Sequence, residues 1–114
     1  MNDPDLSIII LNYNVKELLL NCLDSIFKNK GKDDNWQIIV VDNASEDRST
    51  EAVKEKYPEI ELVENRQNLG FAAGNNVGVK YAKAPVILFL NPDTVVIGKA
   101  IQNSYKFLME KDSL

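Results

Sequence analysis

Short apolar runs rich in β-branched residues alternate along the chain with longer segments whose apolar positions recur every three or four residues. The short runs predict strands at 6–12, 36–42, 60–64 and 85–90. The periodic segments predict helices at 16–29, 46–57, 72–83 and 98–110. Such alternation is typical of a mostly parallel sheet with helices on both faces, joined by right-handed crossovers. We therefore expect an α/β fold with three layers, α/β/α.

The expected burial of these elements differs. The strand at 85–90 is apolar throughout, which predicts burial on both faces, whereas the strand at 60–64 alternates and should be less buried. The helix at 16–29 is expected to bury Leu19, Leu23 and Ile26. The helix at 72–83 is expected to bury Ala73, Val77 and Tyr81.

Polar residues follow all four predicted strands. They are Asn12-Tyr13-Asn14, Asp42-Asn43-Ala44-Ser45, the segment 64–78 and Asn91-Pro92-Asp93-Thr94. Asn and Asp are common in turns for local reasons, so one such cluster carries little information. Ligands of open α/β sheets bind beyond the carboxyl ends of the strands. Four clusters at that edge therefore predict a ligand site.

Asp42 is a candidate ligand for a nucleotide. It directly follows a buried strand, which is too early for a helix cap, whereas Asn43, Ser45 or Asp47 can cap the next helix. A carboxylate at the strand end can accept a hydrogen bond from a ribose hydroxyl or a base N–H. We therefore interpret Asp42 as part of a binding site.

The glycine-rich segment after the third strand has glycines at intervals of four. This spacing is neither the dinucleotide-binding fingerprint nor a P-loop. Gly74 and Gly78 are expected to allow tight helix packing, while Asn68, Gly70 and Asn75 are candidates for a pocket wall.

Asn91-Pro92-Asp93 ends the fourth strand and has two interpretations. One is a plain turn, since Pro fixes φ and Asn or Asp often flank it. The other is a site for Mg²⁺ or Mn²⁺, in which Asp93 supplies a carboxylate and Asn91 an amide oxygen. Such ions take one or two carboxylates together with substrate phosphates.

Composition narrows the possible chemistry. The 114 residues suit one small domain, and a net charge of −4 without a long basic run argues against nucleic acid as a partner. The absence of histidine excludes Ser-His and Cys-His catalysis and histidine-bound zinc. The single cysteine, Cys22, excludes an internal disulfide and is expected to be a small buried residue. No apolar stretch has the length of a transmembrane helix.

The ordered motifs resemble those of a known family. SIIILNYN, IIVVDNASED, NRQNLGFAAGNN and FLNPDTVV are similar to the nucleotide-sugar-binding half of family 2 glycosyltransferases, with the Rossmann-like GT-A fold. The resemblance runs from about Leu6 to Leu114 and is strongest to the rhamnosyltransferase-like branch. It implies that residues 1–114 form a single truncated domain.

The resemblance implies a role for each motif. Asn12, Tyr13 and Asn14 would line the base and ribose pocket, and Asp42 and Asn43 would contact the nucleotide. Asn68, Gly70 and Asn75 would border the nucleotide and sugar. Asn91 and Asp93 would link the metal and the diphosphate. Two residues depart from the family pattern: Asn91 replaces an aspartate, and Arg48 stands where glycine is usual.

The implied activity is transfer of a sugar from a UDP- or dTDP-linked donor to a saccharide or lipid-linked acceptor. The reaction would be inverting, metal-assisted and part of cell-surface polysaccharide synthesis, in the cytoplasm or at the inner face of the membrane. The family's general base lies in the acceptor half, and no residue here fits it, so no catalytic residue is assigned.

Other interpretations remain. A missing acceptor half would leave an open sheet edge, so self-association is expected. It would also be compatible with a nucleotide-binding or interaction module without catalysis. A receiver domain would need acidic residues after the first strand, and Asn12-Tyr13-Asn14 has none.

Overall fold

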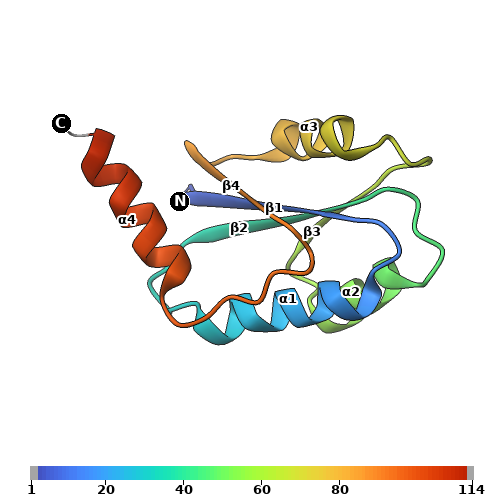
Figure 1. Ribbon diagram of the computed structural model, residues 1–114, viewed down its shortest axis with the longest axis horizontal. Coiled ribbons are helices and arrows are strands. Elements are labelled where there is room, and N and C mark those ends of the chain that lie inside the picture. Colours follow the sequence, from blue (N-terminus) through green and yellow to red (C-terminus); the bar gives the residue numbers. More distant parts are fainter. Residues whose placement is uncertain (1–2, 113–114) are drawn as a thin grey trace.

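The computed structural model describes residues 3–112, which form a four-stranded parallel sheet between two layers of helices (Figure 1). The strand order is β3-β2-β1-β4. The elements are β1 (Leu6–Asn12), α1 (Lys16–Asn29), β2 (Trp36–Asp42), α2 (Ser49–Lys56), β3 (Glu61–Glu64), α3 (Phe71–Tyr81), β4 (Val86–Leu90) and α4 (Ala100–Asp112). The predicted three-layer α/β fold is confirmed. Met1, Asn2, Ser113 and Leu114 lie outside the described residues.

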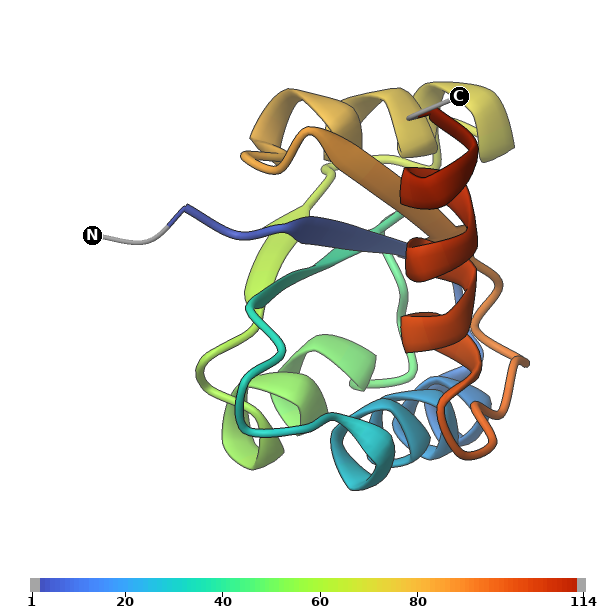
Figure 2. The same cartoon turned by 90° about the vertical axis from the view of Figure 1, so that its left-hand side faces the viewer.

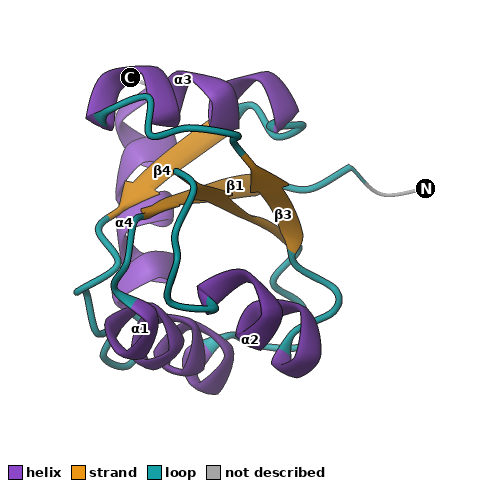
Figure 3. Cartoon of the chain, turned by 90° about the vertical axis from the view of Figure 1, so that its right-hand side faces the viewer, coloured by secondary structure: helices purple, strands orange, loops and turns teal. Residues whose placement is uncertain are grey.

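The helices divide between the two faces of the sheet. α1 and α2 cover one face and α3 covers the other, as the end-on view shows (Figure 3). Ile8 and Ile10 of β1 pack with the first pair of helices, and Ile9 packs with α3, because alternate residues of a strand face opposite ways. The predicted face of α1 is confirmed, since Leu19, Leu23 and Ile26 are fully buried.

The prediction for the inward face of α3 was wrong in part. Ala73 and Tyr81 are exposed, and the fully buried positions are Gly74 and Gly78. A Cβ on Gly74 would lie 2.6 Å from Leu11 Cδ1. The helix backbone therefore approaches the sheet closely at both glycines, which confirms the tight packing predicted for Gly74 and Gly78, and Val77 packs beside them.

The prediction that the fourth strand is buried on both faces was also wrong. β4 is the edge strand next to β1, its residues are half-buried, and 51% of Phe89 is exposed. β3, at the other edge, is half-buried as predicted.

The α2 helix begins at Ser49, three residues later than predicted. Arg48 adopts a left-handed conformation with a φ of 65°, so the helix cannot extend back through it. The last helix, α4, flanks the β4 side of the sheet (Figure 2) and packs mainly through Ile101 and Tyr105.

Candidate functional site

The carboxyl ends of the parallel strands bring the predicted polar residues to one edge of the sheet. Asn12 pairs in register with Asp42, and Asp42 pairs with Glu64 on β3. Ile10 pairs with Leu90, so β4 delivers Asn91 to the same edge. The four clusters therefore meet where sequence reasoning placed the ligand site.

The Asp42 carboxylate is buried and accepts three hydrogen bonds within the chain. Only 3% of Asp42 is exposed. Its Oδ1 accepts hydrogen bonds from Asn12 Nδ2 at 2.9 Å and from Ser45 Oγ at 2.7 Å, and its Oδ2 accepts one from the Ser45 backbone at 2.9 Å. Asp42 thus joins the ends of β1 and β2. Its role as a direct nucleotide ligand stays a prediction.

Asn12 and Asn43 are also buried beneath the edge. The Asn12 Oδ1 atom has no hydrogen-bond partner, because the amide turns its Nδ2 toward Asp42 and Ser45. Asn43 donates to the Gly70 carbonyl at 3.1 Å and accepts from Asn65 Nδ2 at 2.8 Å. Asn43 therefore holds the start of α3.

Sequence reasoning missed Asn65. It follows β3 directly, within the polar segment 64–78, and its backbone N–H also bonds the Asp42 carbonyl at 2.8 Å. Its position immediately after a strand was the signal that could have identified it.

The remaining predicted residues lie at or near the surface. Tyr13 is 46% exposed, and Asn14 next to it is exposed and left-handed, with a φ of 53°. Asn68 accepts a hydrogen bond from the Gly70 backbone at 2.8 Å. Gly70 has a φ of 85° and a ψ of 179°, a conformation that essentially only glycine adopts.

A pocket of about 160 Å³ opens beside the end of β4. It brings together two predicted residues, Asn75 of α3 and Asn91, and the exposed Phe71 is also part of its wall. Its walls consist of Leu11, Phe71, Asn75, Phe89, Leu90, Asn91 and Pro92. With mixed apolar and asparagine walls and this small volume, the pocket can take part of a ligand, such as one sugar ring or one phosphate, rather than a whole nucleotide sugar.

Asn91-Pro92-Asp93 is a tight turn in the structure. The Thr94 N–H bonds the Asn91 carbonyl at 3.0 Å, and Asn91 and Asp93 are both exposed. The thiol of Cys22 lies beneath, 3.9 Å from that carbonyl. Burial, and then the negative charge of Asp93, raise the pKa of the Cys22 thiol to about 11, so this cysteine is a buried neutral residue as predicted.

The turn offers one carboxylate and one amide to a cation. Within residues 3–112, no three acidic, histidine or cysteine side chains gather closely enough to hold a metal ion. Asp93 and Asn91 are the oxygen-bearing side chains of this turn that could contribute to a Mg²⁺ or Mn²⁺ site, because such ions take one or two carboxylates and complete their shell with phosphates and water.

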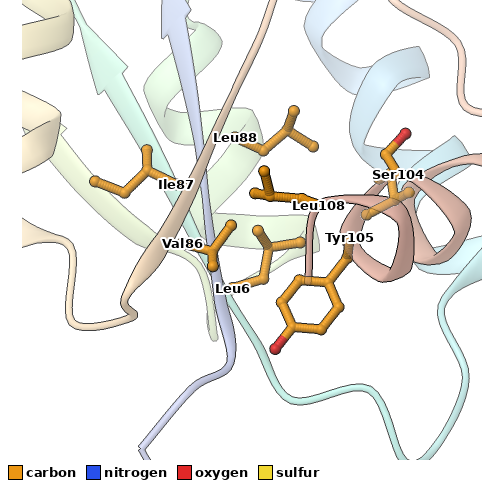
Figure 4. A pocket seen from close by; sticks show the side chains of 8 residues that line it. Leu6, Val86, Ile87, Leu88, Ser104, Tyr105 and Leu108 are labelled. Atoms are coloured by element: carbon orange, nitrogen blue, oxygen red, sulfur yellow. The ribbon is translucent and has the colours of Figure 1, made fainter. Parts of the chain in front are cut away.

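A second pocket, of about 90 Å³, lies between β4 and α4 (Figure 4). Leu6 and Val86, which begin β1 and β4, line it, so it lies at the opposite end of the strands from Asn12 and Asn91. Its other walls are almost entirely apolar. It therefore belongs to the packing of α4 rather than to the candidate site.

The model for glycosyl transferase family 2 matches residues 7–113. The chain is 35% identical over 109 residues to the minor teichoic acid biosynthesis protein GgaB of Bacillus subtilis. The matched region covers 93% of this chain and 12% of that protein. It is 33% identical over 112 residues to the poly(ribitol-phosphate) beta-glucosyltransferase of Bacillus spizizenii. This matched region covers 95% of this chain and 18% of that protein. The chain thus spans less than a fifth of these curated relatives.

A solved structure shares the fold. The mannosyltransferase PcManGT from Pyrobaculum calidifontis, in complex with GDP-Man and Mn²⁺, superimposes with a TM-score of 0.83 at 26% identity, over 95% of this chain and 33% of that one. This likeness confirms the predicted GT-A type of fold. In the described part of the chain, no helix combines the length and apolarity needed to cross a bilayer.

Proposed function

Because the chain belongs to glycosyl transferase family 2, we propose that it binds the donor in transfer of a sugar from a nucleoside-diphosphate sugar to a saccharide or lipid-linked acceptor. The observation that carries this proposal is the pocket at the carboxyl edge, where Asn75 and Asn91 converge beside the Asn91-Pro92-Asp93 turn. The complex of PcManGT with GDP-Man supports a nucleotide sugar as the ligand.

The exposed residues at this edge have defined places in the proposal. Tyr13 and Asn14, exposed after β1, would contact the base and ribose, and Asn68 and Gly70 stand at the start of α3. Asn75 offers its amide to the sugar or the diphosphate. Asp42 and Asn43 lie one layer deeper, and the Asp42 Oδ2 atom, which accepts one hydrogen bond from the chain, has a lone pair left for a nucleotide donor.

A divalent cation fits beside the diphosphate. Asp93 and Asn91 would hold Mg²⁺ or Mn²⁺, and the presence of Mn²⁺ in the PcManGT complex supports a divalent cation as the cofactor. When bound, the cation would offset the negative charge that develops on the leaving diphosphate. Pro92 fixes the backbone between the two ligands, so their spacing is set in advance.

The proposed reaction is a direct displacement that inverts the anomeric centre. An acceptor hydroxyl attacks the anomeric carbon, the nucleoside diphosphate leaves, and a base removes the proton of the hydroxyl. We assign no residue of this chain to that base.

The names of the two relatives support a cell-wall polymer of the teichoic acid type as the acceptor. The rhamnosyltransferase-like branch, a dTDP-linked donor and a setting at the inner face of the membrane stay predictions. Self-association of the chain through its open edge is likewise a prediction.

Calorimetric titration with UDP, GDP and dTDP, with and without Mn²⁺, tests the proposal. We expect one nucleotide to bind in a Mn²⁺-dependent way, and Asp93→Ala to weaken it at least about tenfold by removing the one carboxylate of the turn. Asp33→Ala is the matched control, because Asp33 is exposed in the loop before β2, at the opposite edge. If the folded wild-type chain binds none of the three nucleotides, the proposal fails for this chain.

A further inference from the structure

The loops that follow β1 and β2 are joined at the hydroxyl of Ser45, and we propose that Ser45 is a positioning residue of the donor site. It holds Asn14, and through it Tyr13, in the place where a nucleotide would meet them. This inference rests on the proposed function, because only nucleotide binding makes the β1–α1 loop part of a site.

The Ser45 hydroxyl uses its whole hydrogen-bonding capacity inside the chain. It donates to Asp42 Oδ1 at 2.7 Å, and it accepts from the Asn14 backbone N–H at 2.9 Å and from Asn12 Nδ2 at 3.3 Å. A serine hydroxyl has one proton and two lone pairs. Nothing remains for a ligand, so Ser45 acts on the site through the residues it holds.

Asn14 needs such support because its backbone is left-handed, with a φ of 53°. Asparagine tolerates this conformation better than most residues, but it is still less favourable than an extended or helical one. Two hydrogen bonds connect Asn14 to the β2–α2 loop. The Asn14 N–H donates to Ser45 Oγ, and the Glu46 N–H donates to Asn14 Oδ1 at 2.7 Å. The two loops therefore fix one another. Tyr13 is held in position as well, because both of its sequence neighbours, Asn12 and Asn14, are bonded to Ser45.

The same hydroxyl also helps to keep the Asp42 carboxylate in place. Two of the three hydrogen bonds that the Asp42 carboxylate accepts come from Ser45, one from its hydroxyl and one from its backbone N–H. Ser45→Ala removes the first and spares the second. The variant should therefore fold, while Asn14 loses its acceptor and Asp42 loses one donor.

Amide hydrogen exchange of the ligand-free chain is the first measurement. In Ser45→Ala we expect the Asn14 and Glu46 amides to exchange about tenfold faster or more, since each is then protected by one link fewer. The amides of Ile39 and Leu19, in the core, should keep their rates. Ser45→Thr retains the hydroxyl and should restore the wild-type pattern. Ser104→Ala, on exposed α4, is the matched control.

The second measurement is calorimetric titration of the same variants with UDP, GDP and dTDP in the presence of Mn²⁺. Ser45→Ala should weaken binding about tenfold, and Ser45→Thr should restore it. Unchanged exchange at Asn14 and Glu46 would overturn the inference. So would faster exchange with unchanged affinity, because the loop would then not serve the site. If the wild type binds no nucleotide, the proposed function fails, and the exchange rates alone decide whether Ser45 orders the loops.

Discussion

The Asp47 carboxylate accepts a hydrogen bond from the backbone N–H of Lys16, 2.9 Å away and 31 residues earlier in the chain. Lys16 is the first residue of α1, whose N-cap residue, Val15, has no side chain suited to capping. Asp47 also accepts the N–H of Ser49 at 3.0 Å, at the start of α2. One carboxylate therefore serves the first turns of two helices, whose free N–H groups need acceptors.

Asp47→Ala should lower the free energy of unfolding by about 1–3 kcal/mol, because each lost helix cap costs about 1 kcal/mol. Chemical denaturation followed by circular dichroism measures this. Glu46→Ala is the matched control, since only the Glu46 backbone makes a bond to the neighbouring loop. Equal stability of the two variants would contradict the shared cap.

The same carboxylate should make stability depend on acid. Burial tends to raise the pKa of Asp47, but the hydrogen bonds from Ser49 and from the Lys16 backbone outweigh it and hold the pKa below its usual range. A carboxyl whose pKa is lower in the folded state stabilises the chain at every pH above its unfolded-state pKa of about 3.9. This contribution is lost as the pH falls through the folded-state pKa. Chemical denaturation at a series of pH values should show that the free energy of unfolding falls less with acid in Asp47→Asn than in wild type.

The sequence pattern predicted which segments form strands and helices, because alternation and helical periodicity are local properties. It could not predict that β4 is an edge strand. A run such as 86–90 is as apolar as a central strand, and its place in the sheet depends on which strands pair with it. The tight packing of α3 at its glycines was predicted, but Ala73 and Tyr81 were wrongly placed on the inward face, because close backbone approach at Gly74 leaves few apolar side chains that define that face.

The location of the candidate site was predictable, but the orientation of its residues was not foreseen. Asn12 and Asp42 were expected at the carboxyl edge and lie there. Asn12 follows Ile10 by two positions and so faces the same side as that buried residue, toward α1. Strand parity therefore contained the information that Asn12 is buried. The bonds of Ser45 to residues 12 and 14 depend on contacts between distant loops, which no local pattern encodes.

Replacing a left-handed residue by glycine should stabilise the chain. Ala44 and Arg48 have φ values of 63° and 65°, a conformation that costs non-glycine residues about 1–2 kcal/mol. Glycine avoids this cost, but its unfolded state is more flexible, which offsets the gain in stability by about 0.5–1 kcal/mol. We expect Ala44→Gly and Arg48→Gly each to raise the unfolding free energy by about 0.5–1 kcal/mol. Ala52→Gly, inside α2, should instead lower it, and a loss of stability in all three would refute the conformational argument.

Gly78→Ala should destabilise the contact between α3 and the sheet. A Cβ there would lie 2.7 Å from Ile9 Cγ2 and 3.1 Å from Val41 Cγ2, and both side chains are fully buried and branched at Cβ. Because neither can move aside without disturbing the core, we expect a loss of about 1–3 kcal/mol in thermal or chemical unfolding. Ala73→Leu adds more bulk on the exposed side of the same helix and should be nearly neutral. Because alanine is a better helix former than glycine by about 1 kcal/mol, helix propensity alone would make Gly78→Ala more stable, so an unchanged or raised stability would contradict the overpacking.

Tyr57 joins α1 and α2 through two separable contacts, its ring and its hydroxyl. The ring stacks on Phe27 with 4.6 Å between centroids and 12° between planes, and the hydroxyl bonds the Asp24 carboxylate. That bond, followed by the one from Lys56, holds the pKa of Asp24 below its usual range. Tyr57→Phe keeps the stack and removes the hydroxyl, so the pKa of Asp24 should rise toward the ordinary value.

An NMR titration of the Asp24 carboxyl measures this shift. Lys56→Ala should also raise this pKa, because it removes both a hydrogen bond and a positive charge from Asp24. Phe27→Leu is the control that disturbs the stack and leaves the hydroxyl in place. If Phe27→Leu moved the pKa of Asp24 as far as Tyr57→Phe does, the ring stack would be what places the hydroxyl, and the two contacts would not be independent.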